Sequence, residues 1–362
     1  MDEFITERVL TTPPGNGTVD PGVSTETSAL DTPGHHTVRA VLISFFVLSM
    51  AWGNVGNPFV MATILTQRKI RQNVANVFIF NLAIADFCVT SFVDLSYVLG
   101  NIQPRWLKES DLFCGFSASI CIISCTCSLW SITAISVNRY VCVTKGVIYH
   151  KIYTRRNTLL MAAFLWILCF LIDFPNLVGL GKHIFDVKKR GCSFDRLGYY
   201  GYTLYFIGMG VATPMSIVVF CYLKIFLFVR AHHIKIQAWK SGAPSDGHSP
   251  IDGGKKIDTR LLRTVAIIFI VFLLCWTPYT IIVLSDLHNT YPDELYVAAI
   301  IMAHANSSMN SILYGVTNKN FRDGYRKLIQ TMTCGRACAS RADRQVTNPS
   351  STVQRTTRVE RR

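Results

Sequence analysis

Long apolar runs dominate the pattern of hydrophobic and polar positions along this chain of 362 residues. Each of seven runs is long enough to cross the roughly 30 Å apolar core of a bilayer as an α-helix that rises about 1.5 Å per residue. The runs span residues 38–66, 73–99, 112–145, 157–178, 199–232, 258–287 and 293–317. None has the alternating pattern of a transmembrane β-strand. The pattern therefore predicts an all-α membrane protein built as a seven-transmembrane helix bundle.

The polar segments divide the chain into four parts. Residues 1–37 are rich in Thr, Pro, Gly and Ser and are expected to form a disordered extracellular N-terminus without a cleaved signal peptide. Residues 38–317 form the predicted bundle. Residues 318–331 combine basic and apolar positions and predict a short amphipathic cytoplasmic helix at the inner membrane surface. Residues 332–362 are expected to form a disordered cytoplasmic tail.

Composition and charge agree with a membrane protein and give its orientation. The chain is 50% hydrophobic and only 16% charged, against about a quarter charged in a soluble protein. Its net charge is +14, and Lys and Arg gather in the links after the first, third, fifth and seventh runs. Since cytoplasmic loops carry the excess of positive charge, these links are expected inside and the N-terminus outside. A nucleic-acid-binding surface is the other explanation of the positive charge, and the high apolar content of the chain disfavours it.

A buried carboxylate marks the second run. Asp86 lies near the middle of that run between apolar neighbours, so it must face the bundle interior and find partners. The candidate partners are polar residues of the first, third and seventh runs: Asn57, Ser124, Ser128, Asn306, Ser307 and Asn310. Oxygen ligands around one carboxylate suit a sodium ion. A hydrogen-bonded polar cluster with water is the alternative that these residues leave open.

Near its inner end, the third run carries Asn138-Arg139-Tyr140. An arginine at the inner end of a membrane helix is costly and is usually functional, the alternative being that it reaches out to the lipid headgroups.

In the sixth run, Pro278 predicts a bend next to Trp276, which makes this run a candidate moving lever.

The outer link after the fourth run is basic and contains Cys192. This cysteine and Cys114, at the outer start of the third run, both fall where an oxidising compartment would allow a disulfide. Such a bond would hold Phe194 and Arg196 across the mouth of the bundle, where a guanidinium would attract an anionic ligand such as a carboxylate. The alternative is that Arg196 pairs with Asp195 or with the headgroups.

Two kinds of modification are also expected. Asn16 begins an Asn-Gly-Thr glycosylation sequence in the predicted outer segment. Cys334 and Cys338 follow the last run near basic residues, where palmitoylation is expected.

Taken together, these motifs resemble the rhodopsin-like G-protein-coupled receptors over about residues 40–329. The resemblance rests on Gly56-Asn57, Leu82 to Asp86, Cys114 with Cys192, Asn138 to Tyr140, Trp166, Pro214 with Tyr222, Cys275 to Pro278, and Asn310 to Tyr314. It implies a multi-pass plasma-membrane receptor with a small-molecule ligand, a heterotrimeric G protein, an arrestin, a receptor kinase and membrane lipid as partners. Nucleic acid is not expected as a partner.

The same resemblance implies roles for individual residues. The residues expected to govern G-protein coupling and switching are Asn138, Arg139, Tyr140, Tyr222, Phe272, Trp276 and Tyr314. No cofactor is implied, apart from an allosteric sodium ion at Asp86, Ser128, Asn306 and Asn310. Asn138 stands where the family carries an acidic residue, so one hypothesis is a higher basal activity. Ser311 stands where the family carries a proline.

Both departures look like the melatonin-receptor group, which implies an inhibitory-class G protein. In that group, the residues matching Asn176 and Phe194 contact the indole ligand. However, Arg196 replaces an expected glutamine and Gly210 an expected histidine. The outer segment from Cys192 is instead similar to the medium-chain fatty-acid receptor, in which the matching arginine holds the acidic head.

The expected ligand is therefore indole-like or a small carboxylate or fatty acid. Its expected site consists of Arg196, Phe194, Asn176, Cys121, Cys125, Tyr279 and His304. Cys121 stands where amine receptors carry aspartate, and His304 stands where opsins carry the retinal lysine. Amine receptors and photopigments are therefore excluded.

Two other classes compete with a receptor. A multi-pass transporter could use Asp86 as an ion-coupling site, but no internal repeat supports one. An intramembrane enzyme is disfavoured because the runs lack a His-Glu-x-x-His motif, a Gly-x-Ser-x-Gly motif and paired catalytic carboxylates. The chain is therefore not expected to be an enzyme.

Overall fold

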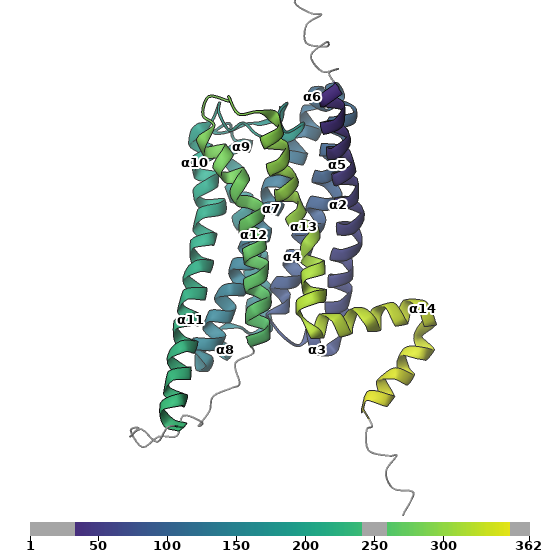
Figure 1. Cartoon of the computed structure of the whole chain (residues 1–362), viewed down its shortest axis with the longest axis vertical. Coiled ribbons are helices and arrows are strands. Elements are labelled where there is room, and N and C mark those ends of the chain that lie inside the picture. The colour runs from purple at the N-terminus through teal and green to yellow at the C-terminus, as the bar shows by residue number, and fades with distance from the viewer. Residues whose placement is uncertain (1–32, 241–258, 348–362) are drawn as a thin grey trace, which may run out of the picture. The chain divides into compact units, whose positions relative to one another are not determined.

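The computed structural model describes residues 33–240 and 259–347 (Figure 1). The chain divides into two units, Met1–Val41 and Leu42–Arg362. Of the first unit, only the start of helix α2 at Pro33 is described. The second unit contains the rest of the fold.

Long helices form the bundle in the order that the apolar runs predict. They are α2 Pro33–Thr66, α4 Asn76–Cys88 with its continuation α5 Asp94–Ile102, α7 Asp111–Thr144, α9 Arg155–Leu177, α10 Tyr200–Tyr205 with its continuation α11 Thr213–Lys240, α12 Thr259–Ser285 and α13 Asp293–Thr317. Among the described residues, six spans are long and apolar enough to cross a membrane. Helix α13 is not among those six, because it carries many polar residues, but it packs against α12 and completes the bundle.

Two of the long helices contain a wider turn. A π-helical segment, Val89–Val93, joins α4 to α5, and a second one, Phe206–Ala212, joins α10 to α11. Shorter helices lie in the links: α3 Arg68–Arg71, α6 Pro104–Glu109 and α8 Gly146–Ile152. Since a π-turn adds a residue without breaking the helix, each long run crosses the bundle as one rod.

Helix α7 lies at the centre of the bundle. It contacts α4, α9, α11 and α12. Of the residues in its most apolar stretch, 67% are buried, against 22% for α2. The buried side chains of α7 are mostly small, such as Ser, Thr, Cys and Ala, and small residues let neighbouring helices approach closely. Every other functional region is therefore positioned relative to this helix.

A two-stranded hairpin, which the apolar pattern did not predict, lies over the N-terminal end of α7, the end that the charge distribution predicts to be the outer one. Strand β1, His183–Asp186, pairs antiparallel with β2, Gly191–Phe194. Between the strands, Arg190 takes the left-handed conformation with φ 52°, which closes the turn. The disulfide between Cys114 and Cys192, expected from the sequence, ties β2 to α7. The hairpin is too short to have been read from periodicity.

The last helix is longer than expected. Helix α14 runs from Lys319 to Thr347 and so continues past residue 331, where the amphipathic helix was expected to end. Residues 332–347 include Arg and Ala, which favour helix formation. At its start, Phe321 is buried and stacks on Tyr314 of α13 with ring centroids 5.2 Å apart.

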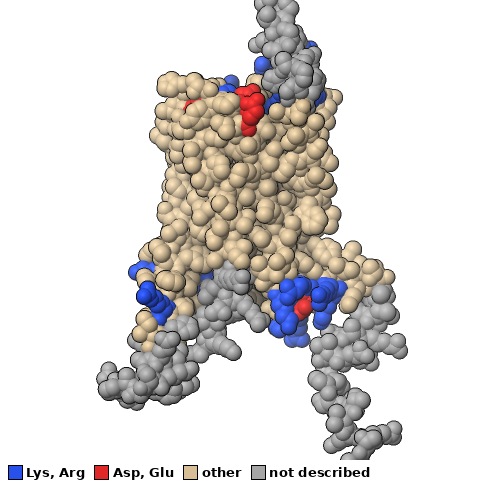
Figure 2. Space-filling view, in the orientation of Figure 1, with Lys and Arg blue, Asp and Glu red and all other residues tan. Residues whose placement is uncertain are grey.

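On the visible face of the molecule, charged residues lie at the ends of the bundle (Figure 2). In Figure 2, the middle of the visible face carries no Lys, Arg, Asp or Glu, and the blue residues gather at the end where α3 and the start of α14 lie. The expected glycosylation site, Asn16, is outside the described residues, and so are the side chains of Cys334 and Cys338.

The disulfide is expected to stabilise the outer side of the fold. Replacing both cysteines, Cys114→Ala with Cys192→Ala, should lower the free energy of unfolding by about 2–5 kcal/mol. The melting temperature of the detergent-purified protein measures this. Cys142→Ala, which changes a free cysteine of the same helix, serves as the control and should have a small effect. Equal melting temperatures for the double variant and the unaltered protein would contradict this expectation.

Candidate functional site

A cavity lies beneath the hairpin at the outer end of the bundle. It is lined by Tyr97, Ala118, Cys121, Ile122, Cys125, Ser193, Phe194, Phe206, Trp276, Tyr279, Ile300, Ala303 and His304. Its volume is about 30 Å³, room for about one water, whereas ligand sites commonly measure about 300–1,000 Å³. The lining side chains therefore have to move apart before a ligand can enter.

Five of the seven residues expected to bind ligand line this cavity. They are Phe194, Cys121, Cys125, Tyr279 and His304. The other two, Asn176 and Arg196, do not line it. Asn176 instead donates from Nδ2 to Asp173 Oδ1 at 3.0 Å, and His183 Nε2 lies 3.0 Å from the same oxygen. Asn176 thus belongs to a polar cluster that joins α9 to β1.

Arg196 joins two outer segments. Its guanidinium donates to the backbone oxygen of Asp286 at 2.6 Å, to Asp286 Oδ2 at 3.3 Å and to Asn289 Oδ1 at 2.7 Å. The side chain of Arg196 is 5% exposed and that of Asp286 is fully buried. Arg196 was expected to attract a ligand or to pair with Asp195. It is engaged instead by the loop between α12 and α13.

Asp286 is held in its ionised form. Burial raises the pKa of its carboxyl group. Hydrogen bonds from the Tyr296 hydroxyl and from the backbone N–H groups of Thr290 and Tyr291, together with the charge of Arg196, outweigh burial and lower the pKa to about 2. The two shortest of these contacts are equal: the Tyr296 hydroxyl lies 2.7 Å from Oδ2 and the Thr290 nitrogen 2.7 Å from Oδ1. The carboxylate therefore organises the whole turn after α12.

Sequence reasoning missed two polar residues next to the cavity. Asp94 of α5 is buried, and its Oδ1 lies 2.6 Å from His304 Nδ1. Asp94 could have been found from the sequence because it is a second acidic residue in the second apolar run. Lys189, in the turn between β1 and β2, is buried with its Nζ 3.1 Å from Ser193 Oγ and 3.4 Å from the Tyr279 hydroxyl. Lys189 could have been found because it belongs to the basic stretch before Cys192.

An aromatic column leads inward from the cavity. The rings of Tyr279 and Trp276 lie 6.1 Å apart, and Trp276 stacks on Phe272 at 5.8 Å. All three rings belong to α12, on either side of Pro278. A change in packing at the outer cavity can therefore be passed along α12 toward the inner half of the bundle.

The carboxylate of Asp86 lies in the centre of the bundle with two of its expected partners. Ser128 Oγ donates to Oδ1 at 3.0 Å, and Asn310 Nδ2 donates to Oδ2 at 2.7 Å. Asn306 is also buried. Within the described part of the chain, Asn306 Oδ1 and Asn310 Oδ1 have no hydrogen-bond partner. The Asn310 amide contacts the Asp86 carboxylate, so its Oδ1 is an acceptor without a donor beside a carboxylate, which is what a small cation requires.

At the inner end, Arg139 is 8% exposed and lies on the central helix. Its neighbour Asn138 donates from Nδ2 to the Tyr149 hydroxyl of α8 at 3.4 Å. Tyr140 and Phe220 pack edge to face with centroids 6.2 Å apart, and Tyr222 stacks on Phe269 at 6.4 Å. The residues expected to govern coupling therefore lie on α7, α11, α12 and α13.

Comparison with known proteins identifies the family. The sequence model described as 7 transmembrane receptor (rhodopsin family) matches residues 56–314. The chain belongs to the rhodopsin family of seven-transmembrane receptors. It is 31% identical to melatonin receptor type 1A of Ovis aries over 301 residues, covering 82% of this chain and 79% of that receptor. It is 29% identical to melatonin receptor type 1B of Homo sapiens over 338 residues, covering 91% and 90%.

The fold is that of solved members of the family. The crystal structure of squid rhodopsin matches with a TM-score of 0.69 and 21% identity, over 87% of this chain and 93% of that one. The chain is therefore a multi-pass plasma-membrane receptor with a small-molecule ligand and a G-protein partner, and it is not an enzyme. The family match sets aside the transporter alternative.

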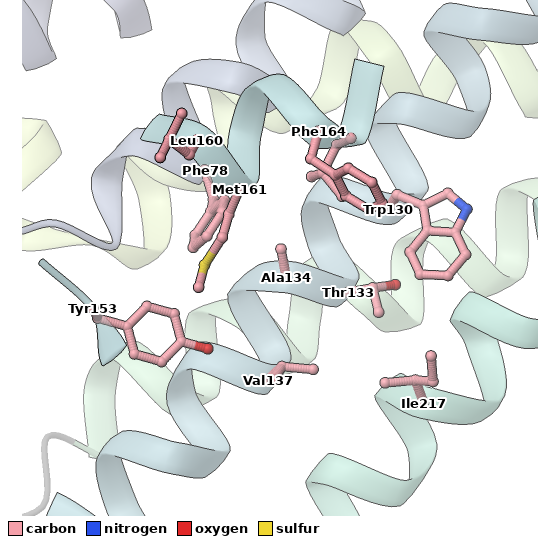
Figure 3. Close-up of a pocket in the computed structure, with 11 residues that line it drawn as sticks. Phe78, Trp130, Thr133, Ala134, Val137, Tyr153, Leu160, Met161, Phe164 and Ile217 are labelled. Atoms are coloured by element: carbon pink, nitrogen blue, oxygen red, sulfur yellow. The ribbon is translucent and has the colours of Figure 1, made fainter. Parts of the chain in front are cut away.

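The receptor also has larger apolar grooves on its side. One of about 520 Å³ lies between α4, α7, α9 and α11, and its lining includes Phe78, Trp130, Tyr153, Met161 and Phe164 (Figure 3). Phe164 is 57% exposed, so the groove opens on the face that meets lipid. Its lining contains no charged residue. This groove offers little to orient a polar ligand, whereas the outer cavity offers hydroxyl groups and a histidine.

The contact between Arg196 and Asp286 is expected to hold the outer loops together. In a double-mutant cycle with Arg196→Met and Asp286→Asn, the coupling free energy should be about 1–3 kcal/mol, because both groups are desolvated. Melting temperatures of the purified receptor measure it. Hydrogen exchange over residues 286–291 should increase in either single variant.

This contact should also be insensitive to pH near neutrality. The carboxyl group of Asp286 has a pKa of about 2 in the folded receptor, below its ordinary value of about 3.9. Its stabilising effect is therefore present above about pH 4 and is lost as the pH falls toward 2. Loss of the coupling energy between pH 7 and pH 5 would contradict this assignment.

Proposed function

We propose that this receptor binds a small extracellular ligand in the cavity beneath the β1–β2 hairpin and activates an inhibitory-class heterotrimeric G protein. The observation that carries the proposal is the position of Trp276. This residue lines the outer cavity and also stacks on Phe272, which lies nearer the N-terminal end of α12. Occupation of the cavity can therefore change the packing of the helix that bends at Pro278. The N-terminus is extracellular in this arrangement, and the basic links face the cytoplasm.

The mechanism is a shift between two packings of the bundle. A ligand favours one packing only to the extent that it binds that packing more tightly. When α12 moves at its inner end, the surface around Arg139 opens and accepts a helix of the G protein in a groove. Asn138, Tyr140, Tyr222 and Tyr314 line or adjust this inner surface. An arrestin and a receptor kinase are expected to use the same active packing.

The ligand is indole-like or a small carboxylate or fatty acid. The similarity to receptors named for melatonin supports an indole and an inhibitory-class G protein. Two residues at the outer end argue for a different ligand from that of the melatonin receptors. Arg196 and Gly210 replace the polar residues expected there. Gly210 is buried, and an added Cβ would lie 3.1 Å from the side chain of Thr126, a tight contact.

The experiment that tests this function is a screen of indoles and fatty acids for activation of an inhibitory-class G protein. The receptor is reconstituted with the purified G protein, and nucleotide exchange is measured with and without each compound. Ligand-dependent exchange is expected. Transport of a compound into receptor-containing vesicles without any G protein would contradict the proposal.

Arg139 is expected to be needed for coupling and not for ligand binding. Arg139→Ala should reduce nucleotide exchange at least about 100-fold, because a guanidinium hydrogen bond to the G protein is lost at the centre of the interface. Ligand affinity should change by less than about threefold, since the outer cavity lies at the opposite end of α7. Lys145→Ala, at an exposed position after the same helix, is the matched control. Unchanged exchange in Arg139→Ala would overturn the assignment.

Asp86, Ser128, Asn306 and Asn310 are proposed to hold a sodium ion that stabilises the inactive packing. Exchanging choline for sodium at constant ionic strength should lower the melting temperature of the receptor by about 2–5 °C, because an ion that binds only the folded state stabilises it by mass action. Asp86→Asn should abolish this difference, and Ser128→Ala should reduce it. A sodium response that persists in Asp86→Asn would count against the site.

A further inference from the structure

The roof of the outer cavity is a cluster of charged side chains, of which Lys189, Arg196 and Asp286 are buried and Lys188 and Asp186 are partly buried. Each carboxylate is paired with one cation, Asp186 with Lys189 and Asp286 with Arg196. A carboxylate that entered the cluster would therefore have to replace one of these two partners.

Two of the three cations are occupied by the loop between α12 and α13. Arg196 binds Asp286 and Asn289, as described above. Lys188 donates from Nζ to the backbone oxygens of Asn289 at 2.9 Å and Tyr291 at 2.6 Å. These contacts join the hairpin to the loop and leave neither cation directed at the cavity.

Lys189 is the cation bonded to the wall of the cavity, although it is not itself a lining residue. Its ammonium group is fully buried and donates to Ser193 Oγ and to the Tyr279 hydroxyl, and both of these residues line the cavity. The same Nζ lies 5.7 Å from the ring centroids of Phe194 and of Tyr279. The two rings and the two hydroxyl groups around this ammonium group all stabilise its positive charge.

The present partner of Lys189 is Asp186, at 2.9 Å. Burial lowers the pKa of the Lys189 ammonium, but the charge of Asp186 outweighs burial and raises it above its ordinary value. The two partners differ in access to water, since the side chain of Asp186 is 16% exposed and that of Lys189 is not exposed. Asp186 is therefore the partner with access to water. Turning outward would break its contact with Lys189 Nζ and the hydrogen bond that its Oδ1 accepts from the Lys189 backbone N–H at 3.2 Å.

We propose that Lys189, and not Arg196, recognises the acidic head of the ligand, whose carboxylate takes the place of the Asp186 carboxylate. This inference rests on the proposed function and specifies the ligand class as an amphipathic anion. The carboxylate lies against Lys189, the Ser193 hydroxyl and the Tyr279 hydroxyl. The apolar part points inward along Ile122, Phe206 and Trp276, which line the same cavity. Arg196 and Lys188 keep the hairpin closed over any ligand.

The replacement of the Asp186 carboxylate by that of the ligand also connects the ligand to the aromatic column of α12. Tyr279 contacts Lys189 and packs edge to face with Trp276. A ligand carboxylate at Lys189 therefore changes the contacts of Tyr279 directly. The alternative is that the Lys189–Asp186 pair only holds the hairpin turn and contacts no ligand.

The test compares acids with neutral analogues of the same shape. The full-length receptor is reconstituted in nanodiscs with an inhibitory-class G protein. The probes are octanoate, decanoate and dodecanoate with the matching primary alcohols, and indole-3-acetate with indole-3-acetamide. Nucleotide exchange gives the potency of each probe. The melting temperature and the basal exchange of every variant show whether it is folded and coupled.

At least one acid should activate the unaltered receptor, and its neutral analogue should be at least about tenfold weaker. Lys189→Met should weaken that acid by about 10- to 100-fold, the effect of losing a charged hydrogen bond, and should leave the neutral analogue within about threefold. Lys189→Arg should restore most of the potency. Asp186→Asn should strengthen the acid, because the competing carboxylate is gone. Lys188→Met, the matched control, should affect the acid and its analogue equally.

Three kinds of result, four outcomes in all, would overturn the role of Lys189. The first is equal loss of acid and neutral analogue in Lys189→Met, which would mean that the residue only packs the roof. The second is unchanged acid potency in that variant or lower acid potency in Asp186→Asn. The third is a receptor that supports exchange, either basally or with a neutral probe, but responds to no acid. A receptor that supports no exchange under any condition would instead overturn the proposed function itself.

Discussion

Charged groups buried inside a membrane bundle must find partners within the protein, and this requirement organises the receptor at each level. Water is absent from the bilayer core, so an isolated carboxylate or ammonium group there is strongly unfavourable. Asp86 is bonded to Ser128 and Asn310, and Asp94 lies against His304. The carboxylate of Asp286 receives Arg196 at the outer surface. The pairs of Asp86 and Asp94 join different helices and the pair of Asp286 joins two loops, so satisfying the charges also fixes how these segments pack.

The central helix links the two ends of the molecule. Its outer end is bonded through Cys114 to the hairpin, and its inner end carries Arg139. Because α7 packs against four long helices, a shift at one end changes contacts at the other. The aromatic residues of α12 lie beside this axis, between the cavity and the inner half of the bundle. The arrangement therefore offers a packed path between the outer cavity and the inner end of α7.

The outer roof shows how the same residue types acquire different roles. Arg196 and Lys189 lie on one short link, and both are buried and positively charged. Arg196 donates its hydrogen bonds to the loop between α12 and α13, whereas Lys189 donates to hydroxyl groups that line the cavity. A planar guanidinium with several donors suits the joining of two loops, and a compact ammonium group suits a single anionic head. Location in the fold therefore decides which cation is available to a ligand.

The sequence by itself determined the class of the protein and much of its site. The apolar runs have lengths set by bilayer thickness, so the seven helices were predictable, with α13 matching residues 293–317. Motif order placed Asp86, Arg139, Trp276 and the two bonded cysteines. Five of the expected ligand residues line the cavity for the same reason.

Only the tertiary structure decided which polar groups meet. The β1–β2 hairpin is too short to have a period, and α14 extends past residue 331 because its local sequence favours helix. The pairs Arg196 with Asp286 and His304 with Asp94 join residues that are 90 and 210 positions apart. Periodicity is a local property, whereas the partner of a buried charge is whatever group the packed helices bring within about 3 Å. That is why the position of Lys189 over the cavity became visible only in the folded receptor.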